Sequence, residues 1–288
     1  MKLLGLIVAW NTVDFIELAI KQALSVCDEV HVCIAPHSTA LEKYDDGTYD
    51  IAKKYEKDVI WLDWYSRSNH ATEKSKILNT MLHNSKIYEV DNWIWTCDAD
   101  EFFDDSFLVN LKGFLMYGME NCGKLLVNER YYYINMQNYL YGEHFRFFRI
   151  NDYNINSTSR FYPTQNWTYI GKHKKMESVV MSHYGMLTNP HSKLDFWKTE
   201  YYGKDQLVKT RWLNEIYRNY DLSNQEYWVN RNKELFGIRS PWFSDSFRPT
   251  EWGILFNDEI QHPKLIEESG LTRIKDFRIK YNFTSEDV

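Results

Sequence analysis

The sequence lacks the patterns that mark several common classes of protein. Its four cysteines, Cys27, Cys33, Cys97 and Cys122, form no CxxC pair and have no zinc-finger spacing, so we expect reduced, mostly buried thiols. Such thiols indicate a cytoplasmic protein, with peripheral association with a membrane left open. No apolar run approaches the roughly 20 residues that a membrane-spanning helix needs. No run of Lys or Arg stands out in a chain of net charge −6, so we expect no nucleic-acid partner.

Aromatic residues, in contrast, are abundant and make up 17% of the chain. Sugar rings have apolar faces that stack on aromatic side chains, so this composition suits a carbohydrate site. Aromatic residues that only fill the core, in a chain also rich in Asn and Lys, explain the same abundance equally well. Composition alone therefore leaves both interpretations open.

Predicted strands and helices alternate through the first hundred residues. Continuous apolar runs predict strands at residues 3–9, 29–35, 59–64 and 93–97. Apolar residues at helical spacing predict helices near residues 15–24, 48–55 and 71–81. This alternation is typical of a mostly parallel sheet with helices on both faces. Ligands of such sheets bind beyond the carboxyl ends of the strands, which here are Asn11, residues 35–38, Asp63 and residues 98–101.

The second half of the chain has a different pattern. The segments LLVNERYYYI (125–134), FRFFRI (145–150) and VVMSHYG (179–185) are short and β-like, which predicts a mixed sheet that completes the domain. After about Asp195 the chain is polar and helical, mainly at residues 198–217 and 224–235. We expect this last part to cover or extend the ligand site.

The most informative segment is WIWTCDADEF (93–102), at the end of the fourth predicted strand. Side chains alternate along an extended chain, so Asp98 and Asp100 point the same way and can converge on one hard cation. Two carboxylates cost too much desolvation to lie unpaired at the end of an apolar strand, and a divalent ion removes that cost. A solvated acidic turn that continues into Asp104 and Asp105 is the alternative. The position after a buried strand favours the metal site.

These segments resemble GT-A glycosyltransferases of the family 2 kind. WIWTCDADEFF is similar to their DxD strand end, and GLIVAWNTVDFIELAI is similar to their first strand and helix. EVHVCIAPHSTALEKYDDGTYDIAKKY is similar to their second strand and nucleotide-contacting loop. The resemblance covers about two-thirds of the chain. It implies an α/β fold of the GT-A, Rossmann-like type, with a mostly parallel sheet flanked by helices and a helical C-terminal extension.

The resemblance also implies a function. It predicts a metal-dependent transferase that moves a sugar from a nucleotide-diphosphate sugar, such as a UDP- or GDP-sugar, to a hydroxyl acceptor such as a glycan, with inversion at the anomeric carbon. The expected cofactor is a divalent metal, Mn²⁺ or Mg²⁺, bound by Asp98 and Asp100. His183 of MSHYG (181–185) is the expected third ligand, because this segment resembles one where a His approaches the metal. Residues 1–195 would form the nucleotide-sugar-binding and catalytic domain, and residues 196–288 the extension on the acceptor side.

Five residues are expected to contact the nucleotide sugar. They are Trp10 and Asn11 after the first strand, Asn69 and Lys74 at a helix start where backbone N–H groups favour anions, and Asp98 itself. Relatives usually have an Asp near Ala35 that binds the base. Here residues 35–38 read APHS, so the identity of the base is open.

The expected catalytic base is Glu177. Many relatives carry His-Glu in the segment that corresponds to YIGKHK (169–174), and here Lys174 replaces that Glu. Glu177 is the nearest carboxylate. Lys174 itself could bind phosphate as a point charge or lie in a solvated turn.

Two other functions fit part of the sequence. A metal-dependent nucleotidyltransferase would use the same sheet and carboxylates, but it usually has a Gly-rich, basic first loop, and AWNT (9–12) has neither feature. A non-catalytic carbohydrate-binding protein would fit the aromatic residues and the missing carboxylate at Lys174. Product formation from a nucleotide sugar separates the enzyme from this last alternative.

Overall fold

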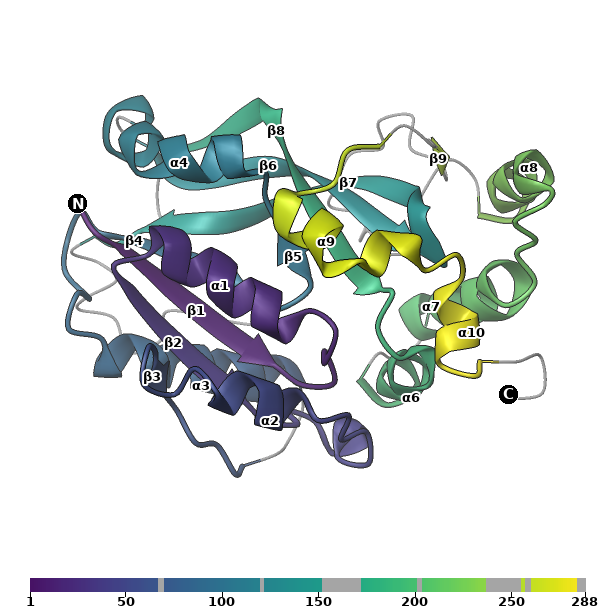
Figure 1. Ribbon diagram of the computed structural model, residues 1–288, viewed down its shortest axis with the longest axis horizontal. Helices are drawn as coiled ribbons and strands as arrows, with labels where there is room; N and C mark the ends of the chain where they lie inside the picture. Colours follow the sequence, from purple (N-terminus) through teal and green to yellow (C-terminus); the bar gives the residue numbers. More distant parts are fainter. Residues whose placement is uncertain are drawn as a thin grey trace.

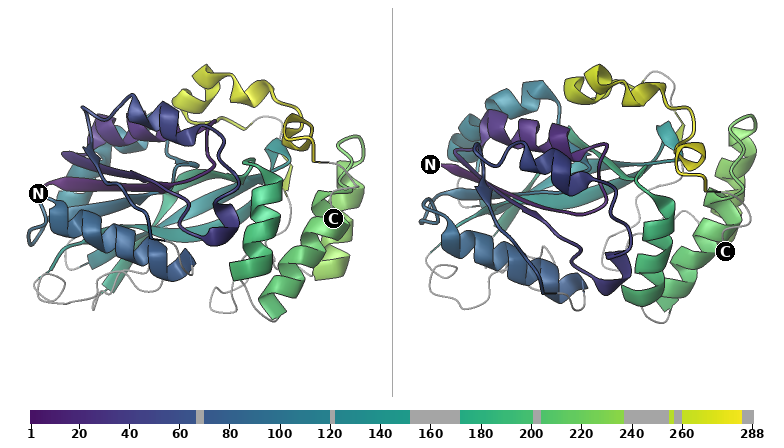
Figure 2. Two further views of the ribbon diagram at one scale, coloured as in Figure 1. Left: turned by 90° about the horizontal axis from the view of Figure 1, so that it is seen from below. Right: turned by 60° about the horizontal axis from the view of Figure 1, so that its bottom comes forward.

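The fold is built on one mixed sheet. The computed structural model describes residues 1–66, 70–119, 122–151, 172–200, 204–236, 255–256 and 260–283. In these residues nine strands form the sheet, in the order β3-β2-β1-β4-β7-β6-β8-β5, and β9 pairs with β7. Helices cover both faces, with α1, α4 and α9 on one side and α3 on the other (Figures 1 and 2). The α/β class expected from the sequence is confirmed.

The first four strands in this order form the parallel half of the sheet. They are β1 (Leu3–Ala9), β2 (Glu29–Ile34), β3 (Ile60–Trp61) and β4 (Trp93–Cys97). The pairings among these four strands are all parallel, as the alternation predicts. The connecting helices are α1 (Ile16–Val26), α2 (Thr48–Lys53) and α3 (His70–Asn84), and a short 3₁₀ turn, η1 (Thr39–Leu41), follows β2.

The third strand is shorter than predicted. It lies at the edge of the sheet, where only Ile60 and Trp61 pair with β2. Leu62 still donates its backbone N–H to the carbonyl of Val32 at 2.9 Å, but the residues after it make no further pairs with β2 in the described structure. The expected strand at 59–64 is therefore wrong in its length.

The two faces of β1 show why the parallel half is well ordered. All seven of its residues are buried. Leu3 and Ile7 pack in the core that includes α1, and Leu4 and Leu6 pack in the core that includes α3. Because side chains alternate across a strand, a continuous apolar run serves a strand that is covered on both faces.

The second half of the sheet contains both parallel and antiparallel pairs. Its strands are β5 (Glu101–Phe102), β6 (Cys122–Tyr133), β7 (Asn135–Arg149), β8 (Lys172–Met186) and β9 (Leu255–Phe256). β7 runs antiparallel to β4, β6 and β9, β6 runs parallel to β8, and β5 runs antiparallel to β8. The mixed sheet expected here is confirmed. β7 and β8 begin well before their predicted segments, because polar stretches such as 135–144 and 172–178 also pair in the sheet.

The remaining helices follow β5 or lie in the C-terminal part. They are α4 (Asp105–Gly113) with the π-helical turn η2 (Phe114–Gly118), α6 (Pro190–Glu200), α7 (Lys204–Trp212) with the π-helical turn η3 (Leu213–Tyr217), α8 (Gln225–Phe236), α9 (Lys264–Ser269), η4 (Leu271–Arg273) and α10 (Phe277–Lys280). Residue 195, the predicted domain boundary, lies within α6.

The C-terminal part packs against the sheet and the first helix. The backbone N–H of Phe277 donates to the carbonyl of Ile134 at 2.8 Å, in the turn between β6 and β7. Tyr281 Oη donates to Asp14 Oδ2 at 2.7 Å, in the loop before α1. All four cysteines are free thiols. None of the helices in the described part of the chain is long and apolar enough to cross a membrane.

Candidate functional site

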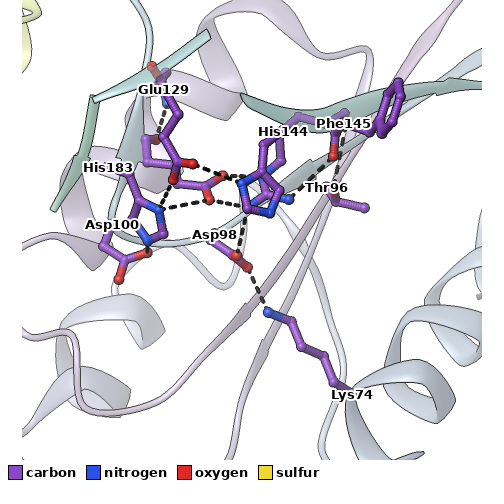
Figure 3. Close-up of polar contacts among 11 residues, drawn as sticks. Lys74, Thr96, Asp98, Asp100, Glu129, His144, Phe145 and His183 are labelled. Atoms are coloured by element: carbon purple, nitrogen blue, oxygen red, sulfur yellow. Dashed lines mark hydrogen bonds and ion pairs between the residues drawn. The ribbon is translucent and has the colours of Figure 1, made fainter. Parts of the chain in front are cut away.

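The candidate site lies where β4 ends and β5 begins, beside β6, β8 and the start of α3 (Figure 3). Asp98 directly follows β4, and its carboxylate accepts a hydrogen bond from Lys74 Nζ at 2.8 Å. Arg146 Nη2 lies 3.5 Å from the other oxygen. Burial alone would raise the pKa of Asp98, but the charges of Lys74 and Arg146 outweigh it and hold the pKa well below its usual range. Asp98 is therefore anionic and already surrounded by positive charge.

Asp100 and His183 are brought together by the pairing of β5 with β8. Glu101 lies opposite His183 in that antiparallel register, and the backbone N–H of Tyr184 donates to the carbonyl of Asp100 at 2.7 Å. As a result, Asp100 Oδ1 lies 3.6 Å from His183 Nε2. The structure thus brings together Asp100 and His183, two of the three residues predicted to bind metal. Asp98 lies close enough for the charge of His183 to lower its pKa, but its carboxylate is paired with Lys74 and Arg146.

Glu129 fixes the orientation of His183. The Glu129 carboxylate contacts His183 Nδ1 with one oxygen and accepts from His144 Nδ1 at 2.9 Å with the other. Burial would raise the pKa of Glu129, but the two histidines outweigh it and hold the pKa low. Burial lowers the pKa of His183, whereas Asp100 and Glu129 raise it, to about 9 overall. Because Nδ1 is engaged by Glu129, Nε2 is the ring nitrogen that faces Asp100.

A buried ion pair lies next to the site and joins β7 to β5. Arg146 on β7 binds both carboxylate oxygens of Glu101, and its Nε donates to Oε2 at 2.5 Å. The two side chains are 3% and 1% exposed. Burial raises the pKa of Glu101, and the Arg146 guanidinium opposes this shift. A bidentate pair of this kind fixes both side chains and therefore the backbone next to Asp100.

Because Gly185 has no side chain, a small space stays open between His183, Tyr131 and Asp100. A Cβ at this position would lie 2.6 Å from His183 Nε2, 3.0 Å from Tyr131 Oη and 3.2 Å from Asp100 Oδ2. The absence of a side chain therefore leaves a small volume lined by one imidazole nitrogen, one carboxylate oxygen and one hydroxyl. This donor set suits a divalent cation that accepts nitrogen and oxygen ligands.

Glu101, Glu129 and His183 form an overlapping group that could hold a metal ion. Their potential ligand atoms all lie within 4.8 Å of one another. Glu101, however, is occupied by Arg146, and Glu129 is occupied by His144 and His183. The oxygens of these two carboxylates already accept charged or polar hydrogens, so Asp100 and the Nε2 atom of His183 are better placed to bind an ion.

Some of the residues expected to contact the nucleotide already form hydrogen bonds within the protein. Asn11 lies near the start of the loop between β1 and α1 with a φ of 58°, and its Nδ2 donates to Ser192 Oγ on α6 at 2.5 Å. Among the described residues, its buried Oδ1 has no hydrogen-bond partner. Trp10 Nε1 donates to the carbonyl of Leu41 at 2.8 Å, which indicates a structural role for the indole N–H. Asn69 lies outside the described residues.

His37, in the segment that departs from the family pattern, is buried near the site. Burial and then the charge of Lys74 lower its pKa to about 3, so the ring is neutral at physiological pH. A neutral imidazole at the end of β2 can both donate and accept a hydrogen bond. No sequence argument singled out His37 as a site residue.

Glu177 and Lys174 lie apart from the other predicted site residues. The Glu177 side chain is 75% exposed and pairs with Lys175 at 2.8 Å. It precedes His183 by six residues on β8, which corresponds to roughly 20 Å along an extended strand. Lys174 Nζ donates to the carbonyl of Gly118 at 2.8 Å, so its ammonium is engaged by η2. The structure does not bring Glu177 to Asp98, Asp100 and His183.

Sequence reasoning missed the residues that support the site. They are Glu101, Glu129, Tyr131, His144 and Arg146. A signal was present, because Glu129 and Arg146 are charged residues within strand-like runs rich in aromatic residues. Charged side chains are rarely buried unless they are paired, so two such residues in separate strands indicate a buried polar network.

Comparison with known proteins finds only distant similarity. No protein-family model matches the chain, and no curated protein matches it. One solved structure that it resembles is mannose-6-phosphate isomerase from Helicobacter pylori, with 14% identity and a TM-score of 0.31 over 54% of this chain and 63% of that one. A second is 4-diphosphocytidyl-2C-methyl-D-erythritol synthase, with 14% identity and a TM-score of 0.34 over 52% of this chain and 75% of that one. A third is CMP:2-keto-3-deoxy-manno-octonic acid synthetase complexed with CTP, with 11% identity and a TM-score of 0.33 over 62% of this chain and 91% of that one. At these TM-scores the similarity assigns no function, so function is inferred below from the side chains of the site.

Proposed function

We propose that the protein is a metal-dependent glycosyltransferase that uses a nucleotide-diphosphate sugar as donor and a hydroxyl group, such as that of a glycan, as acceptor. The observation that carries this proposal is the convergence of Asp100 and His183 Nε2 over Gly185, next to Asp98 at the end of β4. This pair combines the DxD motif and the histidine that resemble those of GT-A enzymes.

The residues of the site fit a divalent cation, Mn²⁺ or Mg²⁺. Asp100 and His183 would hold it, with Asp98 beside them. When bound, such a cation stabilises the negative charge that develops on a departing diphosphate. Glu129 supports this role because its contact with His183 Nδ1 leaves Nε2 as the nitrogen that faces Asp100, and a cation would bind there in place of the Nε2 proton.

Other residues nearby suit the rest of a nucleotide sugar. Lys74 Nζ, 2.8 Å from Asp98, supplies a positive charge at the rim of the site and can bind a phosphate oxygen. The buried Oδ1 of Asn11 can accept a hydrogen bond from a nucleotide N–H or hydroxyl group. Direct displacement with inversion also requires a base for the acceptor hydroxyl. The proposal leaves that base unassigned, since Glu177 lies apart.

A panel of nucleotides and nucleotide sugars tests the proposal. Thermal unfolding is measured with UDP- and GDP-sugars and with nucleoside triphosphates, each with and without Mn²⁺, because a ligand that binds the native state raises the Tm. Release of nucleoside diphosphate is then measured with the stabilising donor and a set of glycan acceptors. We expect a nucleotide sugar to raise the Tm only when Mn²⁺ is present, and diphosphate release to follow.

The same measurements separate the other two functions. A nucleotidyltransferase would be stabilised by a nucleoside triphosphate and would release pyrophosphate. A carbohydrate-binding protein would be stabilised by free sugars without Mn²⁺ and would form no product. Either pattern would contradict the proposed function.

A further inference from the structure

A cavity of about 560 Å³ lies at the opposite end of the long strands from η2. Its walls come from the turn between β6 and β7, from the start of α8, and from the segment that joins α9 to α10. These elements lie side by side in Figure 1, where the C-terminal segment is yellow. This volume is within the range of sites for small molecules, which is roughly 300–1,000 Å³.

Three polar side chains line the cavity without bonding to any other side chain that the structure describes. Gln225, at the first residue of α8, forms no side-chain hydrogen bond in the described part of the structure. Arg273 and Lys275 line the same cavity and are exposed, and among the described residues neither side chain forms an ion pair or hydrogen bond. The cavity therefore offers one side-chain amide and two cationic donors.

Apolar surface completes the lining. Met136, Ile260 and Ile274 face the same space. A ligand that pairs with all these groups carries hydroxyl groups for the Gln225 amide, negative charge for the two cations, and C–H surface for the apolar side chains. A sugar ring has hydroxyl groups at its edge and C–H groups on its faces, and a phosphate or carboxylate adds the charge.

We propose that this cavity binds an anionic saccharide, that is, a sugar that carries a phosphate or a carboxylate group. The site is separate from the metal site. His262 is in the cavity wall, and its Nδ1 is hydrogen-bonded to Tyr184 Oη at 2.9 Å. Neighbouring side chains alternate along a strand, so Tyr184 and His183 point to opposite faces of β8. Binding in the cavity requires neither Asp100 nor a metal ion, so this proposal does not rest on the proposed function.

Calorimetric titration of the full chain in EDTA tests the proposal. The probes are glucose 6-phosphate, glucuronate, glucose and inorganic phosphate. We expect glucose 6-phosphate, glucuronate or both to bind at least about ten-fold more tightly than glucose and inorganic phosphate, because each neutral or ring-free probe satisfies only part of the lining. The two anionic sugars distinguish a phosphate from a carboxylate as the recognised group.

Two variants localise the binding. Replacing both cations (Arg273→Ala with Lys275→Ala) should lower affinity for the anionic sugar about ten-fold or more. Gln225→Leu removes the amide from the cavity lining and breaks no side-chain hydrogen bond of the described residues, so it should weaken binding without lowering the Tm. The matched control replaces Arg231 and Lys264 by Ala, since both are cations of the same region that pair with glutamates outside the cavity lining.

Three results would overturn the proposal. One is the absence of binding by either anionic sugar at millimolar concentration. Another is equal binding of inorganic phosphate, which would show an anion site without sugar recognition. The last is unchanged affinity in both cavity variants. None of these results bears on Asp100 or His183, so the proposed glycosyltransferase function would stand or fall separately.

Discussion

Glu129 makes the hydrogen bond that holds the Nδ1 side of His183. It lies 1% exposed between two histidines, and it contacts the nitrogen of His183 that faces away from Asp100. Carboxylates in this position hold the tautomer and ring angle of a metal-binding histidine. At the proposed metal site, Glu129 would therefore support binding without being a ligand itself.

Glu129→Gln should weaken Mn²⁺ binding by about 10–100-fold, because Gln carries no charge to hold the His183 ring in place. Calorimetric titration of Mn²⁺ measures the change. The matched control is Glu143→Gln on β7, which removes a carboxylate that pairs with Lys175 instead. Equal affinity of wild type and Glu129→Gln would show that His183 is not positioned by Glu129.

Gly185→Ala tests the open space between Asp100 and His183. The added Cβ would lie 2.6 Å from His183 Nε2, closer than the 3.0 Å that real Cβ atoms respect, so the imidazole must move. We expect Mn²⁺ binding to be lost while circular dichroism still shows a folded chain.

Gly113→Ala is the control for the glycine change itself. No atom lies within 4 Å of a Cβ at this position at the end of α4, so this variant should bind Mn²⁺ normally and gain about 0.4–1 kcal/mol of stability. Tight Mn²⁺ binding by Gly185→Ala would show that the ion does not bind in the space between Asp100 and His183.

At the scale of elements, the ion pair between Arg146 and Glu101 joins β7 to the short strand β5. β5 has only two residues and pairs only with β8 in the described structure, so its position depends on side-chain contacts as well as on the ladder. The pair therefore connects β7, in the mixed half of the sheet, to the strand that begins directly after Asp100.

Removing one member of this pair leaves the other buried without its bidentate partner. Arg146→Met and Glu101→Gln should each lower the free energy of unfolding by about 3–5 kcal/mol, and the double variant by clearly less than the sum of the two. Urea denaturation of the four proteins gives this double-mutant cycle. Additive losses, or losses below about 1 kcal/mol, would show that the two side chains do not act as a buried pair.

Local patterns in the sequence predict the elements better than they predict the site. The apolar run at residues 3–9 and the segment at 93–97 identify β1 and β4, since buried parallel strands need apolar residues on both faces. The same reasoning places Asp98 and Asp100 at a strand end. Glu129, His144 and Arg146 could not be placed, because their partners depend on the register between β6, β7 and β8, which no local pattern specifies.

At the scale of the whole molecule, His262 joins the C-terminal part to the centre of the sheet. It is hydrogen-bonded to Tyr184 Oη at 2.9 Å, and its ring packs against that of Tyr132 with centroids 5.1 Å apart. Burial lowers the pKa of His262 to about 4 from its ordinary value of 6.5. The neutral imidazole is therefore part of the folded structure.

The lowered pKa of His262 predicts that the free energy of unfolding decreases in mild acid. Because the unfolded chain binds the proton more strongly, the contribution of His262 is fully present above about pH 6.5 and is lost as the pH falls toward 4. Between pH 7 and pH 5 the loss should be about 1–2 kcal/mol. His262→Gln should show a smaller loss over the same interval in urea denaturation. An identical pH dependence in the two proteins would contradict a buried neutral His262.

The central claim is that Asp100 binds a divalent ion together with His183. Calorimetric titration of Mn²⁺ into wild type, Asp100→Asn and Asp105→Asn tests it most directly. Asn keeps the shape of Asp without its charge, and Asp105 is an exposed carboxylate at the start of α4, so it serves as the matched control. We predict that wild type and Asp105→Asn bind Mn²⁺ with similar affinity, and that Asp100→Asn binds at least about ten-fold more weakly while its Tm without metal stays close to that of wild type. Equal Mn²⁺ affinity in all three proteins, or no binding by any of them, would contradict the metal site and with it the proposed function.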